Sequence, residues 1–444
     1  MIKKTLFWTI LAIGTLAVSD AMASKRDKAR AEVLSRGHGF YKDIFMDSGI
    51  ALTSRKDLPA TKFLGLELEY FASATKDKLS QKDTLRQTNI FCGYEQDTNG
   101  WLLYPDGAPR FRMIYVNGGS ASKHAKSLDD EGKERVQEFV RNGGSYLGTC
   151  AGAYIACKGS MYRNVSKPRW VGMYWALWPQ YAHSTHLLKS SPTMLIPKRS
   201  PLLRYFDFGG DGKVENVRHN GGCYAFESDN APMPDGTERL SSYQFENTDK
   251  VQINGKTSVW AYKPTADSGR TLLCGSHPEG ATSGERLEYM SAMILYAMDG
   301  NAAPRSKGLL TAGEVREMNK HTEAEDPAHT RIGDRQYHHF ELDVPRKCAK
   351  AIIKIEGYKG ENSFDLSLCA KRGELAFHDN TLIKTVGRGC KHTLTIERPK
   401  SGRWFVSVFC ETTVTAHTGK YGTYYRGRVA VLNGVPYKIS VCYE

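Results

Sequence analysis

The feature that most constrains this chain is the segment 148–152, with the sequence GTCAG, which places one cysteine between two glycines. An apolar, strand-like run over 145–147 precedes the cysteine, and the start of a helix rich in small residues follows it over 151–156, so the pattern predicts a strand, a sharp turn and a helix. Glycines on both sides of such a turn avoid clashes where the backbone is strained. The pattern is that of a nucleophile elbow in which Cys150 replaces serine. The N-terminus of the following helix would favour a thiolate.

A second motif lies upstream of the elbow. Residues 112–116, RMIYV, indicate a buried strand that runs directly into the Asn-Gly-Gly of 117–119. Glycines at the end of a strand allow a backbone N–H group to face a ligand. A helical pattern follows over 129–141 and ends at two glycines, 143–144. Together with the elbow this makes a βαβα unit, which predicts a parallel sheet that binds ligands at the carboxyl ends of its strands.

A third motif lies downstream. Residues 270–275 indicate another strand, and Ser-His-Pro-Glu at 276–279 follows it. A histidine two residues before a glutamate, on the rigid turn that proline gives, suits a base and the carboxylate that orients it. The sequence therefore predicts a triad of Cys150, His277 and Glu279.

Two other histidines, His183 and His186, are alternative bases, but neither has an adjacent carboxylate. They follow an aromatic stretch, 170–181, which has two interpretations. It packs in a core or between domains, or it forms a wall of the substrate pocket.

The motifs together resemble the class I glutamine amidotransferase superfamily. They are most similar to the amidotransferase-like domain at the N-terminus of eukaryotic biotin-protein ligases and to its stand-alone bacterial relatives. The residues that carry the resemblance are VNGG at 116–119, GTCAGAY at 148–154 and GSHPE at 275–279, and HNGGCY at 219–224 is similar to the Asn-Gly-Gly loop of that group. The resemblance covers roughly residues 30 to 300. It implies an α/β fold with a flavodoxin-like parallel sheet flanked by helices.

The resemblance also implies roles for individual residues. The catalytic residues would be Cys150, His277 and Glu279. The oxyanion hole would be formed by backbone N–H groups of Ala151 and of Gly118 or Gly119. The substrate-binding candidates are Asn117, Thr149, Asn220, Gly221 and Gly222. Asn117 is a departure, because many amidotransferases have proline there. We expect no metal ion and no cofactor, and the chain has no CxxC pair that would indicate zinc.

The N-terminus has the pattern of a targeting segment. Lys3 and Lys4 precede an apolar run over 6–18, and Ala21-Met22-Ala23 is typical of a cleavage site. We therefore expect a signal peptide over 1–23, cleaved after Ala23, and a secreted or periplasmic protein with no transmembrane span after signal removal. The ten cysteines are compatible with an oxidising compartment.

The C-terminal part has a different pattern. We expect residues 24–300 to form the amidotransferase-like domain. Residues 301–334 are polar and predict a linker with a short helix over 311–320. Residues 335–444 predict a small all-β domain. Closely spaced alternating segments favour a jelly-roll-like β-sandwich. The predicted strands are 340–344, 351–356, 363–369, 392–396, 404–409, 428–432 and 437–441.

This part resembles the bacterial pre-peptidase C-terminal domain. The matching residues are YHHFELDVP at 337–345, NSFDLSL at 362–368 and PKSGRWFVSV at 399–408. Such domains accompany secreted hydrolases and usually have no catalysis of their own.

The net charge of the chain indicates which class of partner it would attract. The formal net charge is +13, and basic residues outnumber acidic ones after residue 331. Such a surplus would steer this part to an anionic surface or polymer, although a generally basic secreted protein has the same composition. No nucleic-acid-binding motif is present, so we do not expect nucleic acid as a partner.

Two functions follow from these observations. The first is a cysteine-nucleophile hydrolase that acts on an amide-containing small molecule or peptide through a thioester. The second is a catalytically inactive binding or scaffold protein on the same fold, attached to a surface by its basic β-domain. Coupled amidotransfer is not expected, because no synthetase domain is present to receive ammonia.

Overall fold

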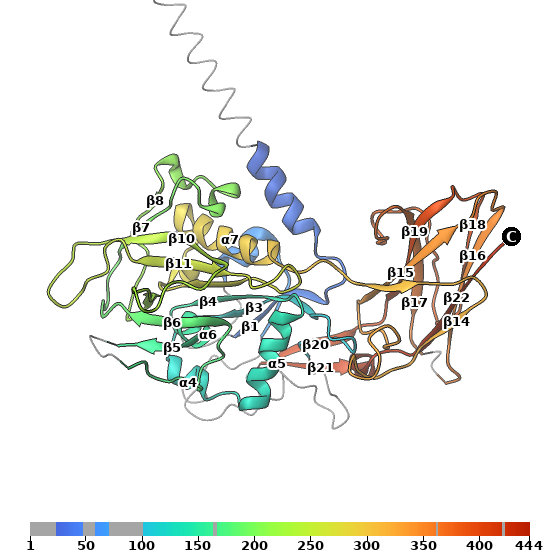
Figure 1. Cartoon of the computed structure of the whole chain (residues 1–444), viewed down its shortest axis with the longest axis horizontal. Coiled ribbons are helices and arrows are strands. Elements are labelled where there is room, and N and C mark those ends of the chain that lie inside the picture. The colour runs from blue at the N-terminus through green and yellow to red at the C-terminus, as the bar shows by residue number, and fades with distance from the viewer. Residues whose placement is uncertain (1–23, 48–57, 71–100, 163–166, 361–362, 420–421) are drawn as a thin grey trace, which may run out of the picture.

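The computed structural model describes residues 24–47, 58–70, 101–162, 167–360, 363–419 and 422–444. The predicted signal peptide, 1–23, lies outside these residues. Figure 1 shows an α/β part followed by a β part that carries the C-terminus. Among the helices of the described residues, none is long and apolar enough to cross a membrane.

The α/β part is built on one nine-stranded sheet with the order β2-β1-β3-β4-β12-β11-β10-β7-β8. The bounds are β1 (Lys42–Asp47), β2 (Leu68–Tyr70), β3 (Phe111–Val116), β4 (Ser145–Thr149), β7 (Thr193–Leu195), β8 (Lys213–Val214), β10 (Thr237–Gln244), β11 (Thr257–Tyr262) and β12 (Thr271–Cys274). The strands from β2 to β12 in this order are parallel, and the rest are antiparallel. The expected parallel strands are therefore part of a larger mixed sheet, because β10, β11 and β12 follow one another through connections that contain no helix.

The parallel strands are buried on both faces, which explains their apolar sequences. Every residue of β3 and β4 is buried. On one face, Ile114 and Tyr146 pack in a cluster with residues of α5 (Asp130–Arg141) and α6 (Ala151–Ala156). On the other face, Met113 and Leu147 pack with residues of α7 (Gly284–Asp299). Successive side chains of each strand point to opposite faces of the sheet, so they pack against two different layers of helices.

The strands and helices predicted around the elbow are present as β3, α5, β4, α6 and β12. α5 begins after Asp129, whose carboxylate accepts a hydrogen bond from the Gly132 N–H group at 2.9 Å, as an N-cap does. The shorter helices of this part are α2 (Pro59–Leu64) and α4 (Ala121–Ala125). A separate three-stranded sheet is formed by β5 (Cys157–Met161), β6 (Trp178–Ser184) and β9 (Cys223–Ala225).

The β part consists of two four-stranded sheets and a hairpin. One sheet has the order β13-β15-β19-β17 and the other β14-β22-β16-β18. The bounds are β13 (Ser306–Leu309), β14 (Val315–Met318), β15 (Tyr337–Val344), β16 (Lys350–Gly357), β17 (Leu366–Arg372), β18 (His392–Glu397), β19 (Gly402–Cys410) and β22 (Tyr437–Tyr443), with β20 (Val414–Gly419) and β21 (Gly422–Gly427) in the hairpin. In β16, Ala351, Ile353 and Ile355 are buried, so one face of this sheet turns toward the core.

Two local predictions for this part were wrong. The expected helix over 311–320 contains β14, because Val315–Met318 pairs along its length with β22. The expected strand over 428–432 lies mostly in a 3-10 helix, Val429–Asn433. Residues 301–334, expected as a linker, supply β13 and β14 to the two sheets. In each case, the local structure depended on whether the segment pairs with a strand that is distant in the sequence.

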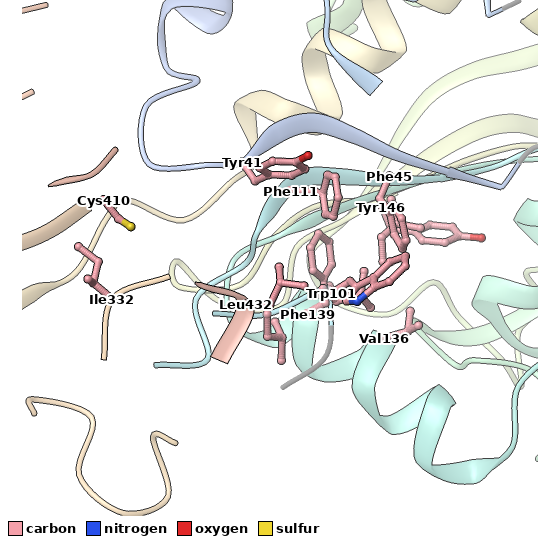
Figure 2. Packing of buried hydrophobic residues seen from close by; sticks show 14 of the residues in the cluster. Tyr41, Phe45, Trp101, Phe111, Val136, Phe139, Tyr146, Ile332, Cys410 and Leu432 are labelled. Carbon is pink, nitrogen blue, oxygen red and sulfur yellow. The ribbon is translucent and has the colours of Figure 1, made fainter. Parts of the chain in front are cut away.

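The two parts are in close contact. The core cluster of the α/β part continues into residues of the β part, and Figure 2 shows Trp101 and Phe139 with Leu432 nearby. The ring of Trp101 lies 4.3 Å, between centroids, from that of Tyr425 in β21. At the same junction, the buried Arg110 donates two hydrogen bonds to the Asp334 carboxylate, at 2.9 and 3.0 Å.

Candidate active site

Cys150 occupies the turn between β4 and α6. Its φ of 46° and ψ of −102° are strained for a residue other than glycine. Its N–H group donates to the carbonyl of Cys274 in β12 at 2.8 Å, which ties the elbow to the neighbouring strand. A Cβ atom at Gly152 would overlap the backbone of Val116, and one at Gly148 would overlap the backbone of Gly152. The two glycines of the motif are therefore required by close backbone packing.

The helix after the elbow is short. α6 ends at Ala156 because the chain enters β5 at Cys157. The main electrostatic partner of the thiol is consequently a side chain rather than a long helix.

That partner is His277, which β12 brings to Cys150. β12 pairs in parallel with β4, with Cys274 opposite Thr149, so the residues after both strands meet at one edge of the sheet. The His277 side chain interacts electrostatically with Cys150, and its Nδ1 atom lies 2.9 Å from Oε1 of Glu279. Because Nδ1 is occupied by Glu279, Nε2 is the ring nitrogen left for the thiol.

Electrostatics favour the protonated form of this histidine. Burial lowers the pKa of His277, but its interactions with the Cys150 and Glu279 side chains outweigh burial and raise the pKa to about 10. Glu279 is 3% exposed, and within the described part of the chain its second oxygen, Oε2, has no hydrogen-bond partner. Cys150 is a free thiol. The arrangement is that of a thiol, a base and a buried orienting carboxylate.

The residues predicted for the oxyanion hole lie around this group. Ala151 is the first residue of α6, directly after Cys150. A Cβ atom at Gly118 would overlap the His277 ring, so this glycine of the Asn-Gly-Gly turn is required by the position of the base. Gly119 has a φ of 151°, in the region that favours glycine.

The predicted substrate-binding residues differ in their surroundings. Asn117 is fully buried, and neither polar atom of its amide has a hydrogen-bond partner among the residues that the structure describes. The carbonyl oxygen of Asn220 lies 4.0 Å from Cys150 Sγ. The hydroxyl of Thr149 instead lies 3.1 Å from the buried Tyr115 hydroxyl, so Thr149 packs within the sheet.

The loop 219–222 covers the nucleophile. Gly221 has a φ of 70°, and a Cβ atom at Gly222 would overlap the carbonyl of Gly275. The phenol of Tyr154 donates to the carbonyl of Gly222 at 2.9 Å. Under this loop Cys150 is 3% exposed. The structure thus places Asn220, Gly221 and Gly222 over the site rather than along an open groove.

The alternative bases lie elsewhere. His183 stacks on Tyr224, with ring centroids 4.8 Å apart, and its Nδ1 atom lies 2.7 Å from the carbonyl of Ser184. His186 packs against Tyr162 at 4.6 Å. In the aromatic stretch before them, Trp175 and Trp178 are fully buried, which fits the interpretation as a core. Among the residues that the structure describes, no group of three His, Cys, Asp or Glu side chains is arranged to hold a metal ion.

Sequence reasoning missed one buried residue beside the site. His219 is fully buried between Thr185 and Ser276. Its position as the first residue of the HNGG segment was the available signal, but nothing in the sequence indicates its partners.

Comparison with known proteins agrees with part of the resemblance. Residues 108–172 match the family model described as biotin-protein ligase, N terminal. This match covers the Asn-Gly-Gly turn and the elbow, and it supports the amidotransferase-like interpretation of that region.

A relative from Chlamydia muridarum (strain MoPn / Nigg), described as an uncharacterized protein, is 32% identical over 184 residues. The match covers 38% of this chain and 60% of the relative, so the chain spans 60% of the length of the protein it matches.

Two solved structures are similar only to a low degree. PliG, a periplasmic inhibitor of g-type lysozyme from Aeromonas hydrophila, is 16% identical with a TM-score of 0.15, over 24% of this chain and 77% of that one. Gan42B, a GH42 β-galactosidase from G. stearothermophilus, is 9% identical with a TM-score of 0.22, over 68% of this chain and 32% of that one. Scores this low carry no argument about fold or activity.

Proposed function

We propose that the protein is a cysteine hydrolase that cleaves an amide bond of a small molecule or peptide. The observation that carries the proposal is the grouping of Cys150, His277 and Glu279 at the carboxyl ends of two adjacent parallel strands, with His277 hydrogen-bonded to Glu279 and coupled electrostatically to Cys150. Buried carboxylates that hold a histidine against a nucleophile are a feature of acyl-transfer sites on unrelated folds.

Each residue has a role in the proposed reaction. Cys150 Sγ attacks the amide carbon, and His277 takes the thiol proton and then transfers it to the departing amine. Glu279 holds the ring through Nδ1. The N–H groups of Ala151 and of Gly118 or Gly119 stabilise the oxyanion, and loss of one such donor costs roughly 3–4 kcal/mol. Water then hydrolyses the thioester. Because loop 219–222 covers Cys150, the substrate enters when this loop moves.

The remaining features extend the proposal. We infer that the chain is exported, on the strength of the signal-peptide pattern of 1–23, and that its α/β part is flavodoxin-like in its parallel half. Residues 335–444, which make up most of the β part, are proposed to be a jelly-roll-like domain of the pre-peptidase C-terminal kind. Its basic composition supports contact with an anionic surface or polymer.

A second function has one observation in its favour. Cys150 is 3% exposed beneath the Asn220 carbonyl, as it would be in a protein that binds rather than cleaves its ligand. On this alternative the fold is kept and the thiol is inert.

Alkylation of Cys150 distinguishes the two functions. Wild type, His277→Ala and Glu279→Ala are treated with iodoacetamide over a range of pH, and modification is read by peptide mass spectrometry. Cys442, an exposed thiol, is the reference within the same molecule, and the buried Cys274 reports unfolding. The measured quantity is the ratio of the Cys150 rate to the Cys442 rate.

For a hydrolase, the positive charge of His277 promotes the thiolate, so Cys150 reacts faster than Cys442 near pH 6. This advantage falls about tenfold or more in His277→Ala, since the thiol then lacks its cation. It also fades as the pH rises above about 8.5, because a thiol with no cation beside it is then itself mostly thiolate. A Cys150 that does not react, or whose rate is indifferent to His277, contradicts the hydrolase and favours the binding protein.

A further inference from the structure

His219 is a buried histidine that the proposed reaction does not use. Its Nε2 atom lies 2.7 Å from the Thr185 hydroxyl and its Nδ1 atom 2.8 Å from the Ser276 hydroxyl. The side chain is 0% exposed, and the Tyr243 ring packs edge-on against it at 5.5 Å. Both ring nitrogens are therefore engaged by hydroxyl groups in a buried environment.

The direction of these hydrogen bonds follows from their neighbours. The Thr185 hydroxyl donates to the carbonyl of Gly222 at 3.0 Å, so it accepts from an Nε2–H group of His219. With its proton on Nε2, the neutral ring accepts at Nδ1 from the Ser276 hydroxyl. The result is one directed series from Ser276 through His219 and Thr185 to Gly222.

A neutral ring agrees with its surroundings. Burial, and then the charge of His277, lower the pKa of His219 to about 3. A protonated ring would be a donor at both nitrogens, and the acceptor function toward Ser276 would be lost.

The two ends of this series adjoin two segments of the site. Ser276 directly precedes His277, the proposed base. Gly222 ends the loop whose Asn220 carbonyl faces Cys150 Sγ. A backbone hydrogen bond from the His277 N–H group to the carbonyl of Arg218, 2.8 Å long, joins the same segments beside the series.

We propose that His219 is a positioning residue, which as the neutral Nε2–H form couples the turn that carries His277 to the loop that covers Cys150. This proposal rests on the proposed function, in which His277 is the base and Cys150 the nucleophile. Buried networks of this kind are effective only when each member is satisfied, since a half-satisfied network loses its rigidity.

The first experiment reads the ring itself and needs no substrate. In the full chain labelled with 15N-histidine, the His219 signals are assigned by their absence in His219→Gln. We expect the pattern of a neutral Nε2–H ring that stays unchanged from about pH 5 to about pH 8, unlike a free histidine, which titrates near 6.5. A ring that titrates in this range, or that carries its proton on Nδ1, overturns the proposal.

The second experiment tests the coupling. Thr185→Val keeps the shape of the side chain but removes the hydroxyl between His219 and Gly222, whereas Thr185→Ser keeps the hydroxyl. Ser241→Ala is the control for the loss of a buried hydroxyl, because Ser241 bonds Ser258 and Tyr289 outside the series. The readout is the ratio of Cys150 to Cys442 alkylation over the pH range used above.

We expect Thr185→Val to lower the ratio about tenfold and to move its pH profile toward that of His277→Ala, since small displacements of a reacting pair are costly. Thr185→Ser and Ser241→Ala keep the wild-type profile. Protection of the buried Cys274 from alkylation shows that Thr185→Val is still folded. If this folded variant also keeps the wild-type profile, the coupling is disproved. An inert Cys150 in the wild type instead refutes the proposed function, while the NMR result still decides the state of His219.

Discussion

At the residue scale, a single glycine determines whether the base can lie against the nucleophile. Gly118 follows β3, and the space that its side chain would fill is taken by the His277 ring. The sequence predicted a glycine turn here for a backbone N–H group that faces a ligand. The structure adds a second reason, which is the room that the imidazole needs.

Gly118→Ala is therefore expected to displace His277 while leaving the sheet intact. We predict that the ratio of Cys150 to Cys442 alkylation near pH 6 falls about tenfold, because the ring moves out of reach of the thiol. Gly280→Ala is the matched control, since Gly280 follows Glu279 directly and has open space around its Cα atom. An unchanged ratio in Gly118→Ala would show that the ring accommodates the methyl group.

At the element scale, the elbow depends on how closely α6 approaches β3. A Cβ atom at Gly152 would overlap the Val116 carbonyl, which belongs to the backbone and cannot rotate away. The strands and helix of this region were predicted because their signals are local, namely an apolar run, a glycine turn and the glycines 143–144 that end the helix. The strand β14 was missed, because Val315–Met318 is a strand only through its pairing with β22.

Gly152→Ala is expected to destabilise the fold by about 1–3 kcal/mol through overpacking. The free energy of unfolding is measured with urea, and Gly280→Ala provides the reference for adding a methyl group without a clash. A change in Gly152→Ala no larger than in the reference would mean that α6 shifts away from β3 at little cost.

At the scale of the whole molecule, a buried ion pair joins the two parts of the chain. Arg110 and Asp334 are each 1% exposed in their side chains, and Arg110 also donates to the Tyr425 hydroxyl of β21 at 2.9 Å. Tyr425 in turn donates to Glu69 of β2. These contacts attach the hairpin of the β part to the edge of the α/β sheet.

Asp334→Asn should be strongly destabilising, because it leaves the Arg110 guanidinium buried without its counter-charge. We expect a loss of about 3–5 kcal/mol in the free energy of unfolding. The control is Glu134→Gln, which breaks a pair with Arg141 whose side chains are 55% and 54% exposed and which should change stability by less than about 1 kcal/mol. Equal effects of the two substitutions would contradict a structural role for the buried pair.

Local chemistry accounts for what the sequence determined by itself. The glycines at 148 and 152, the histidine before Pro278 and the apolar runs before each turn indicate an elbow, a base and buried parallel strands, since these signals span only a few neighbouring residues. Tertiary structure alone decided that β12 lies beside β4, that the sheet is mixed, that residues 301–334 contribute to the β part, and that Arg110 meets Asp334. The same holds for His219, whose partners Thr185 and Ser276 are 34 and 57 residues away. Such contacts depend on the order of strands in the sheet, and no pattern of adjacent residues encodes that order.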